Sequence, residues 1–281
     1  MKQTIVTHIR PDLDACTSVW LIKRFLPNWT DAEVLFVPAG NTYENRPADT
    51  DNNVIHVDTG LGKFDHHQFR QRLSASERIF DYLPKIRKFR ALDKLALERL
   101  VELVTMIDNF EEVKFTEPDS DIYDMGIHQL IEGLKINNNI DSEVMDTALI
   151  MVEGLFAILK RKVIAEKDVE EGLEFGTGKI KAIYLVSKSK EASKLAEKRG
   201  YKLVLLKDTD SGNINIRVHP LAKFNLDKLY KQIIKLESPD LWFYHSSGHL
   251  LLNGSNSHPV KPTKLSHKRL MELIEEFVQK T

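Results

Sequence analysis

The pattern of apolar and polar residues predicts a short buried strand followed by a helix at the start of the chain. The segment "KQTIVTHI", residues 2–9, is rich in β-branched residues, as is typical of strands. Apolar side chains then recur at helical spacing from Val19 to Leu26, and Pro27 ends the run. The polar segment "HIRPDLDA", residues 8–15, therefore lies on a strand-to-helix turn.

The next hundred residues continue an α/β pattern. The runs "AEVLFVPAG" and "NNVIHVDTG" are short, apolar and ended by turn residues, which is typical of parallel strands in a sheet covered by helices on both faces. From Ser74 to Asp108 the period becomes helical, so Asp108 is expected on a helix. Residues 141–171 stay helical for most of their length after the capping segment "DSEV".

A second α/β pattern begins after residue 179. It contains the strands "IKAIYLVS", "YKLVLLKD" and "NINIRVHP", a charged surface helix closed by Gly200, and a helix at 226–237. We predict an N-terminal domain over 1–140 with a mainly parallel sheet, a linker helix over 141–172, and a smaller α/β domain over 173–281 that faces the first across a cleft.

Composition narrows the classes of protein that fit. With 281 residues, 42% of them hydrophobic, the chain can bury a sizeable core, and its formal net charge of −1 offers no global basic field for nucleic acid. Cys16 is the only cysteine, which excludes a disulfide or a thiolate metal site within one chain. No window approaches the ~20 apolar residues of a membrane span, so we expect a cytoplasmic protein with no membrane partner. Apolar residues along 144–158 could dock a partner, so the sequence is compatible with an oligomer.

Acidic and imidazole side chains gather at the predicted strand ends. Because loops diverge at the carboxyl edge of an open α/β sheet, residues there can meet in a crevice. Carboxylates this close repel one another unless cations lie between them, and oxygen ligands with a few imidazoles suit Mn²⁺ or Mg²⁺. Each motif alone also has a structural explanation as a helix cap, turn or surface loop. The residues concerned are His8, Asp12, Asp14, Asp58, Asp65, His66, His67 and, on the helix, Asp108.

As a set, "HIRPDLDA", "VDTG", "FDHHQ" and "MIDN" resemble the four-motif signature of the DHH phosphoesterase superfamily. The spacing of "DHHQ" after Asp58, and "NINIRVHP" followed by "WFYHSSGH", are similar to the branch of the melanocyte-proliferating-gene exonucleases. The P-D-x-D form of the first motif is instead the one shared by RecJ-type nucleases, oligoribonucleases and family II pyrophosphatases.

The resemblance implies a centre of two divalent cations, with Mn²⁺ expected first and Mg²⁺ as the alternative. Asp58 would bridge the ions and act in catalysis, His67 and Arg10 would face the phosphate, and Asp65 would orient an imidazole or bind backbone. The remaining ligands would be His8 and Asp12 on one ion and Asp14, His66 and Asp108 on the other.

The second domain offers a loop for substrate binding within the stretch 244–259. Its small residues let backbone amides approach a ligand, although a plain turn explains them equally well. The resemblance favours binding by His245, Ser246, Ser247, Gly248 and His249.

We therefore expect a phosphoesterase that hydrolyses phosphodiester bonds of short single-stranded oligonucleotides through a two-metal hydroxide mechanism. The near-neutral net charge favours short substrates, because long duplexes are usually held by many phosphate contacts. The alternatives are a pyrophosphatase or small nucleotide phosphatase, and a metal or nucleotide sensor without turnover. Since every expected ligand is present, an enzyme is favoured over a sensor.

Overall fold

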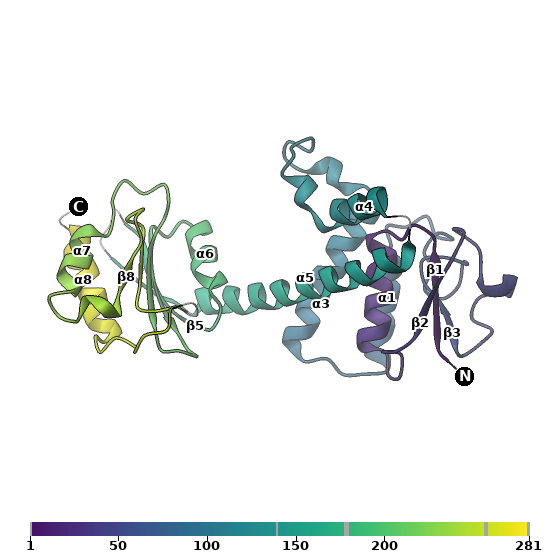
Figure 1. Ribbon diagram of the computed structural model, residues 1–281, viewed down its shortest axis with the longest axis horizontal. Coiled ribbons are helices and arrows are strands. Elements are labelled where there is room, and N and C mark those ends of the chain that lie inside the picture. The colour runs from purple at the N-terminus through teal and green to yellow at the C-terminus, as the bar shows by residue number, and fades with distance from the viewer. Residues whose placement is uncertain (1, 139, 177–179, 256–257, 280–281) are drawn as a thin grey trace. The chain divides into compact units, whose positions relative to one another are not determined.

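The computed structural model describes residues 2–138, 140–176, 180–255 and 258–279. It divides into two compact units, Met1–Lys160 and Arg161–Thr281. The first runs from purple to teal in Figure 1 and the second from green to yellow. The expected α/β class is confirmed in both. Across the described ranges, no helix combines the length and apolar character that a membrane crossing requires.

The first unit contains a three-stranded parallel sheet. Its strands β1 (Thr4–His8), β2 (Glu33–Val37) and β3 (Val54–His56) are ordered β2-β1-β3. The central strand β1 is shielded on both faces, since the adjacent residues Ile5 and Val6 are fully buried. Because all three strands run the same way, their carboxyl ends meet at one edge of the sheet.

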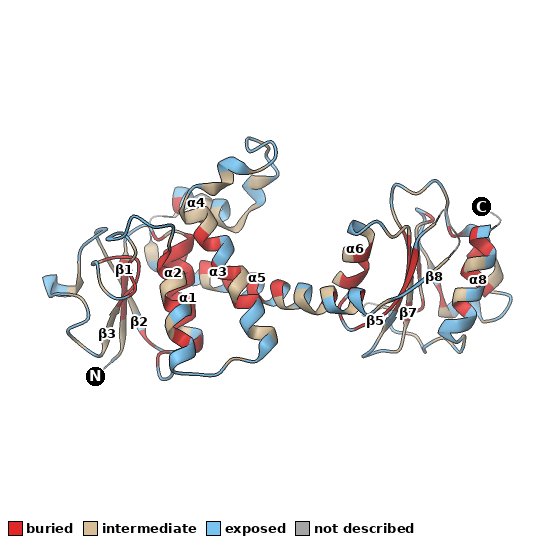
Figure 2. Cartoon of the chain, turned by 180° about the vertical axis from the view of Figure 1, so that it is seen from behind, coloured by how far each residue is buried: buried red, intermediate tan, exposed pale blue. Residues whose placement is uncertain are grey.

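Helices account for most of the rest of the first unit. In Figures 1 and 2 the first three lie on the same side of the sheet. The last, α5, continues past Lys160 into the second unit. They are α1 (Leu13–Phe25), α2 (Ala75–Tyr82), α3 (Ala91–Asp108), α4 (Ile127–Asn137) and α5 (Asp141–Glu170), with short 3₁₀ turns at Tyr43–Asn45, Leu83–Lys85, Glu111–Lys114 and Tyr123–Met125.

The sequence pattern predicts an unbroken helical segment from Ser74 to Asp108, but the structure has two helices there. Helix α2 ends at Tyr82, a 3₁₀ turn that contains Pro84 follows, and α3 begins at Ala91. Proline has no backbone N–H to continue the helical ladder, so the chain turns there. Ser74 caps the start of α2 by accepting a hydrogen bond from Glu77 N at 3.1 Å.

The second unit is built on a six-stranded mixed sheet, ordered β4-β5-β6-β7-β9-β8. Only β5 and β6 pair in parallel among its described strands. The expected strands correspond to β5, β6 and β7, and the helix expected over 226–237 is shorter; the last helix, α8, was not predicted. The elements are β4 (Leu173–Phe175), β5 (Ala182–Ser187), α6 (Glu191–Lys198), β6 (Leu203–Asp208), β7 (Ile214–Val218), α7 (Asp227–Ile233), a 3₁₀ turn at Pro239–Leu241, β8 (Phe243–Tyr244), β9 (Leu250–Leu252) and α8 (His267–Gln279).

The two faces of this sheet are covered differently. On one face, alternate residues of the strands pack with α7 and α8 in a continuous apolar core. On the other face, Ala192 and Ala196 of α6 and two residues of α5, Ala165 and Val169, pack only against β5 and β6. Figure 2 shows α6 and α8 on opposite sides of the sheet. Within the described residues, β7 and β9 therefore carry no helix on the α6 face.

An aromatic cluster in the core of the first unit predicts a large effect of a single truncation. The ring of Phe156 on α5 packs edge-on against Trp20 and Phe25 of α1, with centroids 5.3 and 6.0 Å away. Phe156→Ala should lower the free energy of unfolding by about 3–5 kcal/mol, because it leaves a cavity between the helices. Ile158→Ala on the same helix is the control, since Ile158 is 51% exposed and should change stability by less than about 1 kcal/mol. Urea denaturation measures both values, and equal effects would contradict this packing.

Candidate metal centre

His8 ends the central strand and presents one ring nitrogen to the sheet edge. Its Nδ1 donates to the backbone carbonyl of Ile9 at 2.9 Å, which fixes the tautomer and leaves Nε2 toward the acidic groups. Nε2 lies 3.3 Å from Asp58 Oδ2 and 3.9 Å from Asp12 Oδ1. Burial opposes the charged ring, but the bond to Asp58 and the charge of Asp12 outweigh it and raise the pKa of His8 to about 9.

Asp12 and Asp14 both have structural roles at helix starts. Asp12 caps α1, since its Oδ1 accepts from Ala15 N at 3.0 Å. Asp14 is fully buried and accepts from Ala75 N and Ser76 N, the first amides of α2, at 2.6 and 2.9 Å. Burial, and then the charges of Asp58, Asp108 and Asp12, raise the pKa of Asp14 well above its usual value. The capping explanation therefore holds for Asp12, whereas Asp14 lies within α1 and binds the start of α2 instead. Both also lie among the other acidic and imidazole groups.

Asp58 lies between two imidazoles. It follows β3, its side chain is 2% exposed, and its backbone has a left-handed φ of 55°. Oδ2 faces His8 Nε2 at 3.3 Å, and Oδ1 faces His66 Nε2 at the same distance. Burial alone would raise the pKa of Asp58, but the two imidazoles lower it below its usual value. A non-glycine residue in this conformation persists only where its surroundings hold it there, and such residues cluster at functional sites.

The segment Asp65–His67 adds two imidazoles that are held in different ways. His66 Nε2 lies 3.5 Å from Asp108 Oδ2 and 3.9 Å from Asp14 Oδ2. Burial opposes its charge, but the carboxylate of Asp58, which it faces, and the charges of these two aspartates raise the pKa of His66 to about 9. His67 is 59% exposed and donates from Nδ1 to Asp65 Oδ1 at 2.7 Å. Asp65 also accepts from backbone amides, so it orients an imidazole, one of the two roles expected for it.

Asp108 reaches the site from the last residue of α3. Asn109, the next residue, holds this helix end by donating from Nδ2 to Thr105 O at 2.8 Å and to Leu73 O at 3.0 Å. Burial, partly opposed by the charge of His66, raises the pKa of Asp108 to about 7. A helix terminus and a loop from distant parts of the sequence thus meet at His66.

The structure brings the six expected metal ligands into linked clusters. Within each cluster one ligand atom of every residue lies within 4.8 Å of the others. The clusters are His8, Asp12 and Asp58; Asp14, His66 and Asp108; and Asp58, His66 and His67. Asp58 therefore belongs to two of them. All of these residues except Asp14 and His66 line a cavity of about 400 Å³, together with Ala39, Gly40, Leu61 and Asp65.

The residues present fit divalent cations. Asp58 Oδ1 and His66 Nε2 are both buried, and neither has a hydrogen-bond partner among the described residues. They face each other at 3.3 Å without the geometry of a hydrogen bond, so they remain unsatisfied buried polar atoms. A cation bound by carboxylate oxygens and imidazole nitrogens would satisfy both atoms and neutralise the carboxylates. The donor set is consistent with divalent metal binding and does not specify the metal.

Arg10 does not line this cavity. Its backbone has a φ of 52°, its N donates to Asp141 Oδ1 at 3.0 Å, and its carbonyl accepts from Lys135 Nζ at 3.3 Å. Lys135 is buried and also pairs with Glu132 at 2.5 Å. The turn that carries Asp12 is thus fixed from α4 and α5. The role of Arg10 toward a phosphate stays a prediction.

The loop expected to bind substrate connects β8 and β9 in the second unit. Its side chains bond within the loop: Ser247 Oγ lies 2.9 Å from His245 Nδ1 and accepts from His249 N at 3.3 Å. Gly248 has a φ of 75°, and a Cβ there would meet Asn225 at 2.9 Å, so the turn itself requires glycine. A binding role for His245–His249, which includes Ser246, stays a prediction, and residues 256–257 of the longer stretch lie outside the described residues.

Sequence reasoning missed several residues that shape the centre. Ala39 and Gly40 follow β2 at the same sheet edge as the ligands, so their strand-end position was a usable signal. Gly40 N donates to Thr59 Oγ1 at 3.1 Å, which ties the turns after β2 and β3 together. No local signal marks Lys135 or Asp141, because their contacts span more than a hundred residues.

Comparisons with known proteins give one family, and the similar solved structures include two distant ones. Residues 5–159 match the family described as "ChrB, C-terminal domain". No curated protein matches the chain. RecJ in complex with Mg²⁺ from Thermus thermophilus is 13% identical with a TM-score of 0.37, covering 99% of this chain and 50% of RecJ, so this chain spans half the length of that protein. An exopolyphosphatase-related protein from Bacteroides fragilis is 12% identical with a TM-score of 0.25, covering 99% of this chain and 92% of that one. TM-scores this low have no bearing on function.

The protonation of the centre predicts how metal binding depends on pH. In the metal-free protein the raised pKa values of His8 and His66 stabilise the fold fully below about pH 6.5, and this stabilisation is lost as the pH rises through about 9. Metal must displace these protons, so its affinity should increase between about pH 6.5 and 8.5, about tenfold per pH unit for each proton released.

Calorimetric titration with Mn²⁺ at several pH values measures this slope, and thermal unfolding in EDTA measures the loss of stability. His66→Gln should make the slope shallower, whereas His219→Gln in the second unit is the control and should leave it unchanged. An affinity that does not vary with pH would contradict the assignment of these imidazoles as ligands.

Proposed function

The chain belongs to the family described as ChrB, C-terminal domain, and we propose that it is a metal-dependent phosphoesterase that hydrolyses phosphodiester bonds of short oligonucleotides. The observation that carries the proposal is the convergence of four separate segments on Asp58. Its two oxygens lie 3.3 Å from His8 and from His66, and His66 in turn lies 3.5 Å from Asp108. These segments are the four motifs whose order resembles the DHH phosphoesterase signature.

Asp58 would help to hold both cations of such a centre. One oxygen belongs with His8 and Asp12, and the other belongs with His66, whose neighbours are Asp14 and Asp108. Two divalent cations held in this way would supply a nucleophile at neutral pH and neutralise charge on a phosphoryl group. Mn²⁺ is the first candidate, with Mg²⁺ as the alternative, since both accept carboxylate and imidazole ligands.

His67 is suited to hold a proton at the phosphate. Its Nδ1 is committed to Asp65 Oδ1 at 2.7 Å, so Nε2 is the ring atom that can bind or release a proton toward substrate. Asp65 is 1% exposed and is itself fixed by Leu61 N at 2.7 Å, which keeps the ring from turning. His67 lines the cavity and is the most exposed imidazole of the centre, as a substrate-binding group should be.

The size and charge of the site support a short substrate. A cavity of about 400 Å³ lies at the small end of the range for small-molecule sites and suits one nucleotide unit rather than a duplex. The formal net charge of −1 agrees with this, since binding along a long polyanion leans on many basic contacts.

The test is a substrate panel with metal-stripped protein and added Mn²⁺. The panel contains short RNA, short DNA, a dinucleotide, a cyclic dinucleotide and pyrophosphate, and released products are separated by chromatography. We expect nucleoside monophosphates from the short oligonucleotides and little from pyrophosphate. Cleavage of pyrophosphate alone would make the protein a pyrophosphatase, and metal binding with no turnover on any substrate would make it a sensor.

Substitutions of the bridging and terminal ligands should differ in effect. Asp58→Asn should lower kcat/KM by a factor of about 10³ or more, because Asp58 serves both clusters. Asp108→Asn should lower kcat/KM by a smaller factor. Asp108 belongs to a single cluster, in which His66 is the one imidazole. Steady-state kinetics at saturating Mn²⁺ compares them, and near-normal turnover of Asp58→Asn would rule the proposal out.

His67→Gln separates proton transfer from metal binding. Because His67 is held by Asp65 rather than buried among the ligands, the variant should keep its Mn²⁺ affinity within about threefold while kcat falls by a factor of about 10²–10⁴. His219→Gln is the control in the second unit. If His67→Gln loses metal and activity together, His67 is a ligand and not the group at the phosphate.

A further inference from the structure

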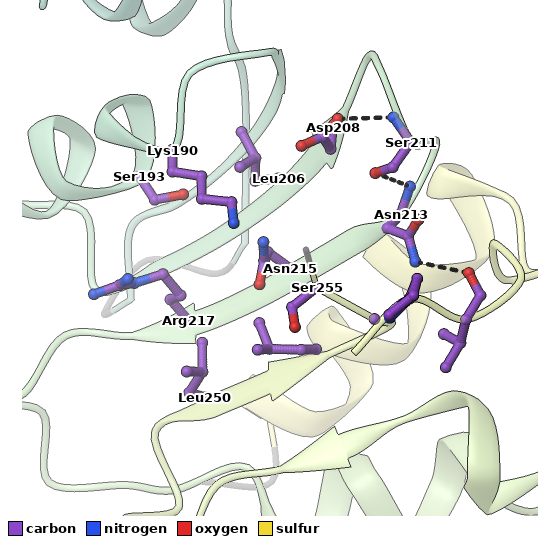
Figure 3. A pocket seen from close by; sticks show the side chains of 14 residues that line it. Lys190, Ser193, Leu206, Asp208, Ser211, Asn213, Asn215, Arg217, Leu250 and Ser255 are labelled. Atoms are coloured by element: carbon purple, nitrogen blue, oxygen red, sulfur yellow. Dashed lines mark hydrogen bonds between the residues drawn. The ribbon is translucent and has the colours of Figure 1, made fainter. Parts of the chain in front are cut away.

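A cavity of about 360 Å³ lies on the second unit, on the α6 face of its sheet. Figure 3 shows it over β6, β7 and β9, with the start of α6 on one side. It lies where α6 no longer covers the sheet, and its volume falls within the range of small-molecule sites. None of the five loop residues from His245 to His249 lines it.

The floor of the cavity is apolar. Leu206 of β6 and Leu250 and Leu252 of β9 turn their side chains to this face, because their strand neighbours fill the core on the other side. Leu250 and Leu252 are only partly buried. A flat apolar group bound here would remove Leu250 and Leu252 from water, as the helices of this face already do for Leu206.

Three polar side chains that line the cavity are unused by the rest of the unit. Ser193 is 2% exposed, and its Oγ has no hydrogen-bond partner among the described residues. Neither the Lys190 ammonium nor the Asn215 side-chain amide bonds or pairs with another residue of the described ranges. Figure 3 shows Lys190 and Asn215 extending toward the same space. A buried hydroxyl without a partner costs free energy, which a ligand bound here would recover.

The other two charged side chains of the cavity, Arg217 and Asp208, already bond within the protein. Arg217 donates to Glu197 from Nε at 3.0 Å and from Nη2 at 3.3 Å. Asp208 Oδ1 accepts from the amides of Asp210 and Ser211 at 2.9 Å, which forms the turn after β6. Among the described residues that line the cavity, Lys190 is therefore the one cation without a counterion. A ligand would place its negative charge at that end.

We propose that this cavity binds a nucleoside monophosphate, with the base over the leucine floor beside Asn215 and the phosphate at Lys190 and Ser193. A side-chain amide offers one donor group and one acceptor, which matches the edge of a nucleobase. Lys190 is the N-cap of α6 and Ser193 lies in its first turn, where backbone amides also favour an anion. The choice of a nucleotide rests on the proposed function, which would release or recognise such a group.

The test is calorimetric titration of the full chain in EDTA, so that the metal centre does not contribute. The probes are AMP, GMP, CMP and UMP, with adenosine, ribose 5-phosphate and inorganic phosphate as partial ligands. We expect at least one monophosphate to bind more tightly than every partial ligand. A 5′-phosphorylated dinucleotide distinguishes the source: equal affinity indicates the end of an oligonucleotide, and at least tenfold weaker binding indicates a free mononucleotide.

Variants separate the contributions of the three side chains. Lys190→Met should weaken monophosphate binding at least tenfold and leave adenosine binding within twofold, whereas Asn215→Leu should weaken both. Ser193→Ala should weaken the monophosphate without lowering Tm, because the hydroxyl has no protein partner to lose among the described residues. The exposed Lys188→Met, on the same connection, is the matched control for charge and should bind as the wild type does.

The proposal is overturned if none of the four monophosphates binds, or if all three variants bind as the wild type does. Asp58→Asn should bind the monophosphate normally, since Asp58 belongs to the first unit. Binding without any hydrolysis would leave this site standing and remove only the proposed function. Hydrolysis of oligonucleotides without binding in EDTA would do the reverse.

Discussion

A carboxylate buried between two imidazoles constrains the whole first unit. Removing the charge of Asp58 from water costs several kcal/mol unless positive groups compensate it. In the metal-free protein His8 and His66 do so, since each lies 3.3 Å away and has a pKa of about 9. Cations in the same place would release both protons. The parallel sheet brings His8 and Asp58 to one edge, and the end of α3 then closes the site at Asp108.

The surrounding residues hold this arrangement through contacts that do not depend on a metal. Asp14 is bound by the first amides of α2, Asp65 fixes His67, and Lys135 fixes the turn before Asp12. These contacts tie residues at or beside the candidate metal centre to neighbouring helices and loops. Binding the start of a helix would not prevent Asp12 or Asp14 from also holding a metal, since a carboxylate has two oxygens and several lone pairs.

The candidate ligands could be predicted from the sequence because strand ends are local signals. A β-branched run that stops at His8 or Asp58 gives the direction of the strand, and parallel strands share their carboxyl edge. The break at Pro84 is also local but was missed, because the apolar period resumes on its far side. Lys135 could not be found in this way, since its partner Arg10 lies 125 positions away and only the packed fold brings them together.

The cavity of the second unit escaped sequence reasoning for a different reason. Along β7 the pattern alternates, with Ile214, Ile216 and Val218 in the core and Asn215 and Arg217 on the other face. Such alternation is ordinary for a strand with one face in water, so it marks no site. Two features distinguish Asn215. No helix packs over it, and it shares a cavity with the buried Ser193, whose hydroxyl has no partner within the described ranges. Both features depend on the position of α6. The two candidate sites thus arise by opposite routes. The first gathers charges at strand ends, where sequence position reveals them, and the second lies where part of a sheet face is left open, which only packing reveals.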